Sequence, residues 1–484
     1  MEHLLNGKYE AVIGLEVHAQ LITSSKAFSS DKNEYGSAPN TNVSEISLGL
    51  PGTLPQFNSH VLRHAIKLGI ACGSEIRHEN TFDRKNYFYA DLPKGYQITQ
   101  DGGPICTGGT IEIKTEAGEK SIRITRIHME EDSGKSIHDQ DPYNSLVDLN
   151  RAGVPLLEIV SEPDIRTGEE AYQYLTEIRK LVRYLEICDG NMEEGSMRCD
   201  ANISVRLKGA EEYGRRVEVK NMNSIRNVQR AIEYEVQRHI EMIEKGEEIK
   251  RETRSFDAVA GTTFGMRSKE MDNDYRYFPE PDLLPVMVNA EDIDHIQENM
   301  PALPNELYAK YTKKLELSEY DARVLIDSKE IALYYEDMIE HTKNFKAAAN
   351  WLTGDIKSHL NKYGIEIAHF QIRARTMADL IELVDSEKVS YSSAAQKIFP
   401  ALLERPNEKP EKLAQELNLI QESDETALLA MVDEALSAYP DKVEEYRNGK
   451  KGLIGLFMGE IMKKSRGKAD PKKTNQLLRE KLEA

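Results

Sequence analysis

The sequence predicts an α+β fold with a largely antiparallel sheet, followed by a region that is almost wholly helical. Runs rich in strand-forming residues recur over the first 290 residues, separated by Gly- and Pro-containing turns. Helical periods fall between these runs at irregular intervals, which argues against a doubly wound parallel sheet. After the Pro301–Pro304 segment, the apolar spacing is helical to the C-terminus.

The apolar patterns place each element in turn. Three helices are expected, over residues 60–71, 167–185 and 224–245. Glu169 and Glu170 stand near the start of the second helix, where the helix dipole favours acidic side chains. Strands are expected at residues 11–21, 110–114, 122–129, 156–160, 201–207 and 216–220.

A chain of 484 residues is too long for one ordinary core, so several domains are expected. The texture of the sequence changes around Pro279–Pro285, and a second break falls at Pro406–Pro410. We therefore predict three domains, at residues 1–292, 293–407 and 408–484.

Composition indicates a cytoplasmic protein. No apolar run approaches the length of a membrane span, and Met1-Glu2-His3 does not begin a signal-peptide pattern. Cys72, Cys106, Cys188 and Cys199 lie far apart and form no CxxC pair, which argues for a reducing compartment and against a zinc knuckle.

The net charge of −19 argues against a nucleic-acid partner for the chain as a whole. Charge is unevenly spread, because residues 450–484 carry ten Lys or Arg against four acidic residues, a net of +6. This basic tail is either a local footprint for an anionic partner or a solvated helix face.

The segment Ile13–Leu21 places Glu16 and His18 two residues apart in a predicted strand. Side chains at this spacing leave a strand on the same face, so the pair can bind a metal or serve as an acid and a base. The alternative is a half-buried strand whose polar face meets solvent.

Residues 133–136, Ser-Gly-Lys-Ser, resemble the end of a phosphate-binding P-loop. Met129 stands where the first glycine of that motif is required, and the three acids that follow it repel phosphate. The P-loop interpretation is therefore rejected.

The same acids suit a cation. Glu130, Glu131 and Asp132 end one predicted strand, and Glu158 lies within another. Magnesium takes oxygen ligands, so acids at strand ends facing Glu16 and His18 can hold Mg²⁺ against the phosphates of a nucleotide such as ATP. For any one of these acids by itself, a surface residue in a turn is the better explanation, and the functional interpretation concerns the group.

A nucleotide also needs cationic and stacking partners, although each candidate segment could be an ordinary loop. The segment 83–89 mixes bases with aromatic residues, and Lys220 stands before the predicted third helix, a place suited to anions. The candidate nucleotide-binding residues are Arg84, Lys85, Asn86, Tyr87, Tyr96, Arg198, Asp200 and Lys220. No amidase-type Gly/Ser segment, nucleophile elbow or synthetase adenylation motif is found.

These motifs together resemble the GatB family, the B subunits of tRNA-dependent amidotransferases, over nearly the whole chain. The resemblance rests on residues 13–18, 50–55, 82–89, 128–132, 158–164, 192–202 and 274–282. The tail, with Gly467-Lys468 and Asn475, is similar to the YqeY-like domain that closes this family.

The resemblance implies a glutamine-synthetase-like cradle, a helical linker domain and a tRNA-binding YqeY-like tail. It implies a heterotrimer with an amidase (the A subunit) and a small third chain (the C subunit). ATP and Mg²⁺ would serve to phosphorylate the Glu or Asp side chain on misacylated tRNA, and ammonia would then displace the phosphate. Residue by residue, it implies His18, Glu131 and Glu158 as metal ligands, with Glu16 as a fourth ligand or as the base that deprotonates ammonium.

Two other functions fit parts of the sequence. One is a non-catalytic scaffold that delivers tRNA to a partner enzyme. The other is a metal-dependent phosphohydrolase or nuclease that uses Glu16, His18 and the acids at 130–132.

Overall fold

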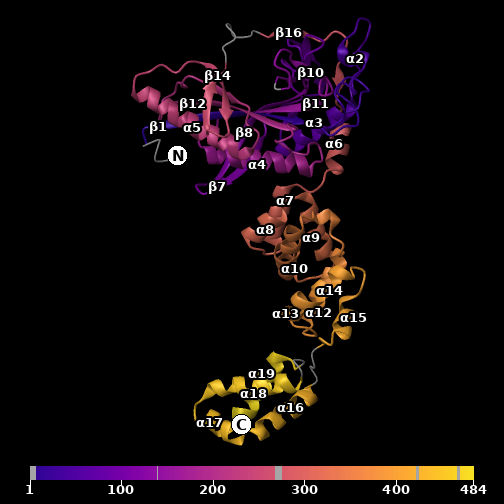
Figure 1. The fold of residues 1–484 in the computed structure, drawn as a ribbon, viewed down its shortest axis with the longest axis vertical. Coiled ribbons are helices and arrows are strands. Elements are labelled where there is room, and N and C mark those ends of the chain that lie inside the picture. The colour runs from indigo at the N-terminus through magenta and orange to yellow at the C-terminus, as the bar shows by residue number, and fades with distance from the viewer. Residues whose placement is uncertain (1–6, 139, 267–274, 421–424, 466–468, 484) are drawn as a thin grey trace. The chain divides into compact units, whose positions relative to one another are not determined.

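The computed structural model describes residues 7–138, 140–266, 275–420, 425–465 and 469–483 (Figure 1). Asp274, Gly467 and Lys468, which belong to the motifs named above, lie outside these ranges, as does the segment Met1–His3. The chain divides into two compact units, residues 1–304 and 305–484.

Unit 1 is built on a ten-stranded sheet of the described residues, and β1 lies near its middle. The order is β15-β14-β13-β12-β1-β11-β8-β6-β2, with β7 paired to β8. Every pairing is antiparallel except that of β13 with β14, which confirms the predicted largely antiparallel α+β fold. The strands are β1 (Tyr9–Gln20), β2 (Glu75–Ile76), β6 (Cys106–Thr107), β7 (Thr110–Thr115), β8 (Gly118–Glu131), β11 (Pro155–Ser161), β12 (Met197–Leu207), β13 (Val217–Lys220), β14 (Glu252–Asp257) and β15 (Thr262–Gly265).

Smaller sheets flank the large one. In the first, β4 (Asp83–Asn86) lies between β16 (Arg276–Pro279) and β5 (Tyr96–Thr99). Two-stranded sheets join β9 (Lys135–Ile137) to β10 (Leu146–Asp148) and β3 (Glu79–Asn80) to β17 (Val286–Met287). None of these strands is expected from the sequence, because two to four residues are too few to show a period.

The three predicted helices are α3 (Ser59–Cys72), α4 (Gly168–Tyr184) and α5 (Ile225–Glu244). The side chains of Thr167 and Ser224 accept hydrogen bonds from backbone N–H groups at the starts of α4 and α5. The helices share one apolar core with the odd-numbered residues of β1, of which Ile13, Leu15 and Val17 are completely buried. The even-numbered residues of β1 therefore lie on the other face of the sheet.

Two further helices belong to unit 1, α2 (Glu45–Leu48) and α6 (Ala290–Glu298). Helix α6 packs against α3, and its residues Ile293 and Ile296 contact the main core. The compact unit that contains these contacts extends to Pro304. The domain limit expected at residue 292 stays a prediction.

Unit 2 is helical, as the sequence predicts. Its last helices enclose a core of their own, which includes Leu428, Phe457 and Leu478. The limit expected at residue 407 stays a prediction. None of the described helices has the length and apolar composition needed to span a bilayer. The helices are α7 (Pro304–Ala309), α8 (Glu319–Leu325), α9 (Lys329–His341), α10 (Phe345–Trp351), α11 (Lys357–Tyr363), α12 (Ala374–Asp385), α13 (Tyr391–Ser393), α14 (Phe399–Glu404), α15 (Pro410–Glu416), α16 (Glu425–Ala438), α17 (Pro440–Arg447), α18 (Ile454–Lys464) and α19 (Pro471–Glu483), with π-helical turns at Lys310–Lys314, Leu352–Ile356 and Ala394–Ile398 and 3-10 turns at Ile367–His369 and Lys451–Leu453.

Candidate active site

A row of polar side chains crosses the face of the sheet opposite the helices. On one side of β1, His18 lies opposite Glu158 of β11, and Glu158 lies opposite His128 of β8. On the other side, Glu16 lies opposite Asp200 of β12. Because neighbouring strands are about 4.8 Å apart, this register brings residues that are distant in sequence within reach of one another.

Glu158 is the centre of the row. Its Oε2 atom lies 3.3 Å from Nε2 of His18 and 3.3 Å from Nε2 of His128. His128 Nε2 is also 3.5 Å from Oε2 of Glu130. The ligand atoms of His128, Glu130 and Glu158 all lie within 4.8 Å of one another, so this group has the spacing of a divalent-cation site.

The electrostatics of this group follow from burial and close partners. Burial by itself lowers the pKa of His128, but hydrogen bonds and the charges of Glu130 and Glu158 raise it to about 9. The pKa of His18 is raised in the same way by Glu158, against the effect of burial. Although burial opposes it, the two imidazoles hold the pKa of Glu158 well below its usual range. The buried carboxylates thus require nearby positive charge, which protons on imidazole or a bound cation can supply.

Glu16 continues the row toward β12 and β13. Its Oε1 atom accepts a hydrogen bond of 2.8 Å from the Asn202 side chain. Lys220 Nζ lies 2.5 Å from Asp200 Oδ2 and 3.0 Å from Glu218 Oε1, so the ammonium neutralises these neighbours. Burial, together with the charges of Glu158, Asp200 and Glu218, raises the pKa of Glu16. Its carboxylate is therefore more basic than an ordinary one.

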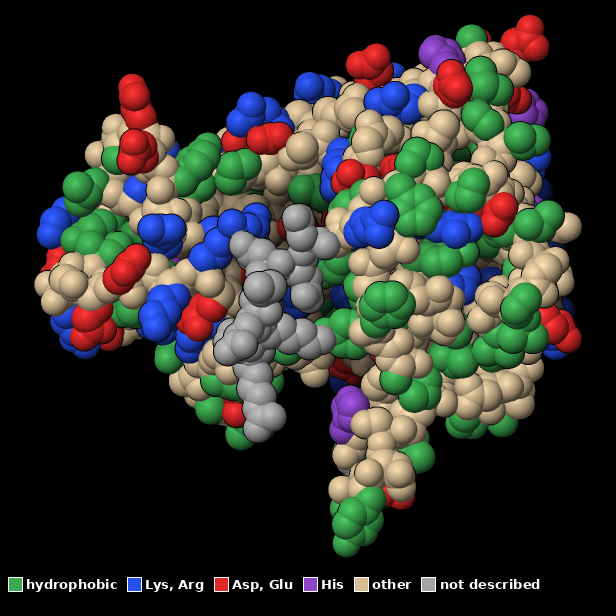
Figure 2. Space-filling view, turned by 90° about the horizontal axis from the view of Figure 1, so that it is seen from above, with side chains coloured by type: hydrophobic (Ala, Val, Ile, Leu, Met, Phe, Trp, Pro, Cys, Tyr) green, Lys and Arg blue, Asp and Glu red, His purple; other side chains and the backbone are tan. Residues whose placement is uncertain are grey.

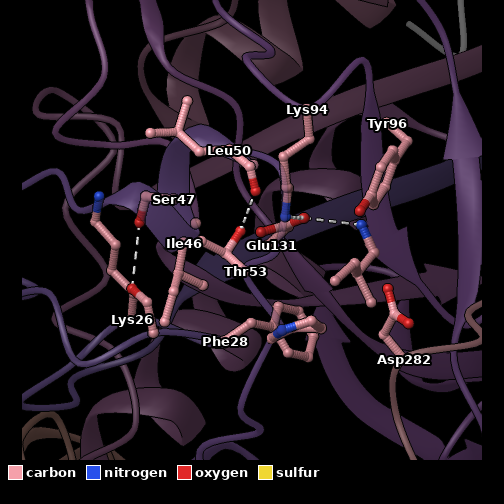
Figure 3. Close-up of a pocket in the computed structure, with 15 residues that line it drawn as sticks. Lys26, Phe28, Ile46, Ser47, Leu50, Thr53, Lys94, Tyr96, Glu131 and Asp282 are labelled. Carbon is pink, nitrogen blue, oxygen red and sulfur yellow. Dashed lines mark hydrogen bonds and ion pairs between the residues drawn. The ribbon is translucent and has the colours of Figure 1, made fainter.

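Glu131 is not part of the row, contrary to the prediction that it binds the metal with His18 and Glu158. Successive side chains of β8 point to opposite faces, so Glu131 points away from the face that carries Glu130. There it pairs with Lys94 Nζ, and it accepts a hydrogen bond of 2.9 Å from the backbone N–H of Ile98. Figure 3 shows Lys94 and Glu131 pointing at each other in a cavity of about 70 Å³ that Phe28 and Tyr96 also line.

His128 and Glu130, rather than Glu131, are the residues of β8 that lie beside Glu158 in the row. From the sequence, the acids at 130–132 are predicted to form one group at a strand end. Strand β8 in fact continues through Glu131, so Glu130 and Glu131 point to opposite faces. The alternation of His128 and Glu130, two residues apart like Glu16 and His18, is the signal that identifies this pair.

The predicted nucleotide-binding residues of β4 separate for the same reason. Lys85 lies toward the row, and its Nζ is 4.9 Å from the ring centre of Tyr275. Burial lowers the pKa of Lys85, but Glu130 and Glu158 raise it above its ordinary value. Tyr87 donates a hydrogen bond to Oε1 of Gln97, whose amide group in turn donates to Glu130 at 3.0 Å.

Arg84, Asn86 and Tyr96 serve other contacts. The Arg84 guanidinium donates to Glu280 at 2.7 and 2.9 Å and to Asp282 at 3.0 Å. It also lies 4.3 Å from the ring centre of Tyr96. Asn86 donates to the carbonyl oxygens of Arg84 and Arg276. These three residues join β4, β5 and β16 to one another, and the structure does not bring them to the row.

Arg198 and Asp200 lie two residues apart in β12 and share one of its faces. Arg198 donates to Oδ2 of Asp132 at 2.7 Å, and Gln20 donates to the same oxygen at 2.7 Å. The face of unit 1 seen in Figure 2 carries Lys and Arg side chains among apolar and acidic ones. Near the row itself, Arg198 pairs with Asp132 and Lys85 lies near Glu130 and Glu158.

Two regions of the chain match known domain families. Residues 11–294 match the GatB/GatE catalytic domain, and residues 333–482 match the GatB domain. The B subunit of the aspartyl/glutamyl-tRNA(Asn/Gln) amidotransferase of Alkalilimnicola ehrlichii is 49% identical over 99% of this chain and 100% of its own. The B subunits of the same enzyme from Rickettsia rickettsii and Trichodesmium erythraeum are each 48% identical, over 98% of both chains. The chain therefore belongs to the GatB family.

Proposed function

We propose that this chain is the B subunit of a glutamine-dependent tRNA amidotransferase. It uses ATP to phosphorylate the side-chain carboxylate of Glu on tRNA(Gln), or of Asp on tRNA(Asn), and ammonia then converts the acyl phosphate to the amide. The observation that carries this proposal is the row His18, Glu158, His128 and Glu130 on a rigid sheet, in a chain about half identical to proteins of that name.

The reaction has two steps. A carboxylate oxygen of the aminoacyl side chain attacks the γ-phosphorus of ATP, and the bond to the bridging oxygen breaks to release ADP. The nitrogen of ammonia then attacks the acyl carbon, and the C–O bond breaks to release inorganic phosphate. Phosphorylation is needed because a carboxylate has no adequate leaving group of its own.

Mg²⁺ fits the donor set at the centre of the row. The oxygens of Glu130 and Glu158 and the imidazoles of His18 and His128 would hold it, with phosphate oxygens and water completing its shell. When bound, it supplies charge stabilisation for the β- and γ-phosphates.

Other side chains of the row have roles that follow from their charge. The Lys85 ammonium, next to Glu130, can hold the carboxylate of the substrate close to the transferred phosphate. Glu16, with its raised pKa, is placed to take a proton from ammonium, because free ammonia is the nucleophile. Arg198 is fixed by Asp132 and provides a second cation.

The proposed enzyme also needs partner chains and a place for the tRNA. An amidase, the A subunit, would release ammonia from glutamine, and a small C subunit would complete the heterotrimer. The helical tail would bind the tRNA. The sheet and its helices would form a cradle like that of glutamine synthetase.

The test uses the purified three-chain complex with misacylated Glu-tRNA(Gln) or Asp-tRNA(Asn). We expect wild-type protein to release ADP only when misacylated tRNA is present, and to amidate it with glutamine or free ammonium. His18→Ala should lower the rates of ADP release and of amidation by at least about a hundredfold, the usual cost of removing a catalytic group. Its binding of tRNA should be unchanged.

The rival functions give other results. A scaffold would release no ADP at all, and a phosphohydrolase would cleave phosphate esters without glutamine or partner chains. Amidation at the wild-type rate by His18→Ala would contradict the proposed site.

A further inference from the structure

The last helices of unit 2 form a C-terminal bundle, residues 425–465 and 469–483, around a small core. Ten described residues are buried in this core, among them Leu428 of α16, Phe457 of α18 and Leu478 of α19. The main core of unit 1 is far larger. Because the stability of a packed region depends on the apolar area that it buries, the bundle depends on every side chain that covers its core.

Three methionine side chains cover the edge of this core. Met431 lies on α16, and Met458 and Met462 lie one turn apart on α18, a spacing that puts both on one face of the helix. All three pack against the buried residues of the bundle and are also partly exposed to water. The two helices that carry them pack against each other. Met129 and Met197 of unit 1, by contrast, are at most 1% exposed.

A thioether in this position is open to oxidation by a peroxide. One oxygen atom passes from the peroxide to the sulfur, so the O–O bond breaks, a sulfur–oxygen bond forms, and hydrogen peroxide is reduced to water. The product is a sulfoxide, which is polar and accepts hydrogen bonds, whereas the thioether is apolar. A polar group in an apolar site without a donor costs free energy, so the oxidised side chain no longer stabilises the core.

Helix α18 also holds cations of the bundle in place. Met462 is followed by Lys463, which is exposed, and by Lys464, which pairs with Glu434 of α16. Loss of packing between α16 and α18 would separate this ion pair and release the turn that carries Lys463. Damage to the apolar edge therefore reaches the charged surface of the bundle.

We propose that Met431, Met458 and Met462 form a reversible oxidation site, at which peroxide loosens the C-terminal bundle and thereby weakens the binding of tRNA. The effect on tRNA rests on the proposed function, whereas the loosening of the bundle does not. Methionine sulfoxide is reduced enzymatically, one reductase acting on each epimer, so the change can be reversed.

The test treats the full three-chain complex with dilute hydrogen peroxide and locates the oxidised methionines by peptide mass spectrometry. Hydrogen exchange of the α16 and α18 amides should become at least about tenfold faster after oxidation, because the bundle opens more often. Binding of tRNA, measured by filter binding, should weaken about tenfold or more. Treatment with both methionine sulfoxide reductases should restore the two values.

A variant with Met431→Leu, Met458→Leu and Met462→Leu removes the thioethers and nearly keeps their volume, so it should fold normally. After peroxide, its amide exchange and its binding of tRNA should stay within about twofold of the untreated values. Met287→Leu is the matched control, because Met287 lies on β17 of unit 1 and is 58% exposed. This control should remain as sensitive to peroxide as wild type.

Two outcomes would overturn the site itself: oxidation of Met287 that leaves the three bundle methionines intact, or three sulfoxides with no change in amide exchange. Equal loss of tRNA binding by the triple Leu variant would place the sensitive group elsewhere, for example at Met242, which packs on the core of unit 1. Faster exchange with unchanged tRNA binding would overturn the coupling to tRNA. Failure of the untreated complex to bind tRNA would instead contradict the proposed function, and amide exchange would still decide the oxidation site.

Discussion

At the scale of single residues, Glu130 and Glu131 show how much one position along a strand decides. Both are buried carboxylates at the end of β8, but Glu130 faces His128 and Glu131 faces a lysine on the other side of the sheet. Composition and spacing identify the acidic run. They do not reveal which of these acids points to which face of the sheet, because the end of a strand is the least certain part of any sequence-based prediction.

This difference predicts opposite behaviour for two isosteric substitutions. Glu130→Gln should weaken Mg²⁺ or Mn²⁺ binding at least about tenfold, because an anionic ligand is removed. Calorimetric titration of the purified protein with each metal measures the effect.

Glu131→Gln should bind the metal within about twofold of wild type. It should instead lower the free energy of unfolding by about 3 kcal/mol, since it leaves the mostly buried Lys94 without its counter-charge. If Glu131→Gln were the variant that lost the metal, the assignment by strand parity would be wrong.

At the scale of secondary-structure elements, a buried carboxylate joins α5 to the far edge of the sheet. Glu235 of α5 is completely buried and accepts from Arg238 at 2.7 Å, with Arg254 of β14 at 3.2 Å. Thr263 of β15 donates to it as well. Burial would raise the pKa of Glu235, but hydrogen bonds from His239, Arg238 and Thr263 lower it to about 2.

Acid should therefore weaken this joint. A folded-state pKa below the unfolded one stabilises the protein above about pH 4.5, and the contribution is lost as pH falls toward 2. Between pH 4.5 and pH 3, wild type should lose about 2 kcal/mol more stability than Glu235→Gln.

Hydrogen exchange of the α5 amides is the suitable measurement, because the single tryptophan, Trp351, lies in unit 2 and does not report on unit 1. Parallel acid profiles for wild type and Glu235→Gln would contradict the role of Glu235.

The long elements of unit 1 could be predicted from sequence, and the short ones could not. The strands β1 and β11 and the helices α3, α4 and α5 match predicted segments closely, because each carries a clear period of burial. Strand β12 begins at Met197, four residues before the predicted strand at 201–207. For β4, the mixture of basic and aromatic residues indicates a binding segment, but a strand of four residues is too short to show which side chains share a face. Lys85 and Arg84 were consequently grouped together, although they point apart.

At the scale of the whole molecule, charge is divided between an acidic catalytic unit and a tail with exposed cations. Part of the basic excess of residues 450–484 is neutralised by acidic residues of the two preceding helices, α16 and α17. Lys464 and Lys481 pair with Glu434 and Asp433 of α16, and Lys450 pairs with Glu445 of α17. Lys463, Lys473 and Arg479 are exposed and have no ion-pair partner among the described residues.

Deletion of residues 425–484 should thus weaken tRNA binding and flatten its dependence on salt. If the tail supplies about three phosphate-binding cations, the slope of log K against log salt should fall by about 2–3. The cut should lie beyond α15, which packs on α12 through its own apolar face, so that the rest of unit 2 is kept intact. Filter binding over a salt series gives the slope, and circular dichroism controls for folding. An unchanged slope would show that the tail does not anchor the tRNA.

The strand β1 has a consequence for quality control in the cell. A shift of one residue in the register of β1 would expose Ile13, Leu15 and Val17 to water. It would also bury Glu16 and His18 in the apolar core. Such a chain would expose an apolar surface and lose the proposed site at the same time. A sheet assembled in the wrong register would therefore present exposed apolar surface to chaperones and proteases whenever it also disrupts the proposed site.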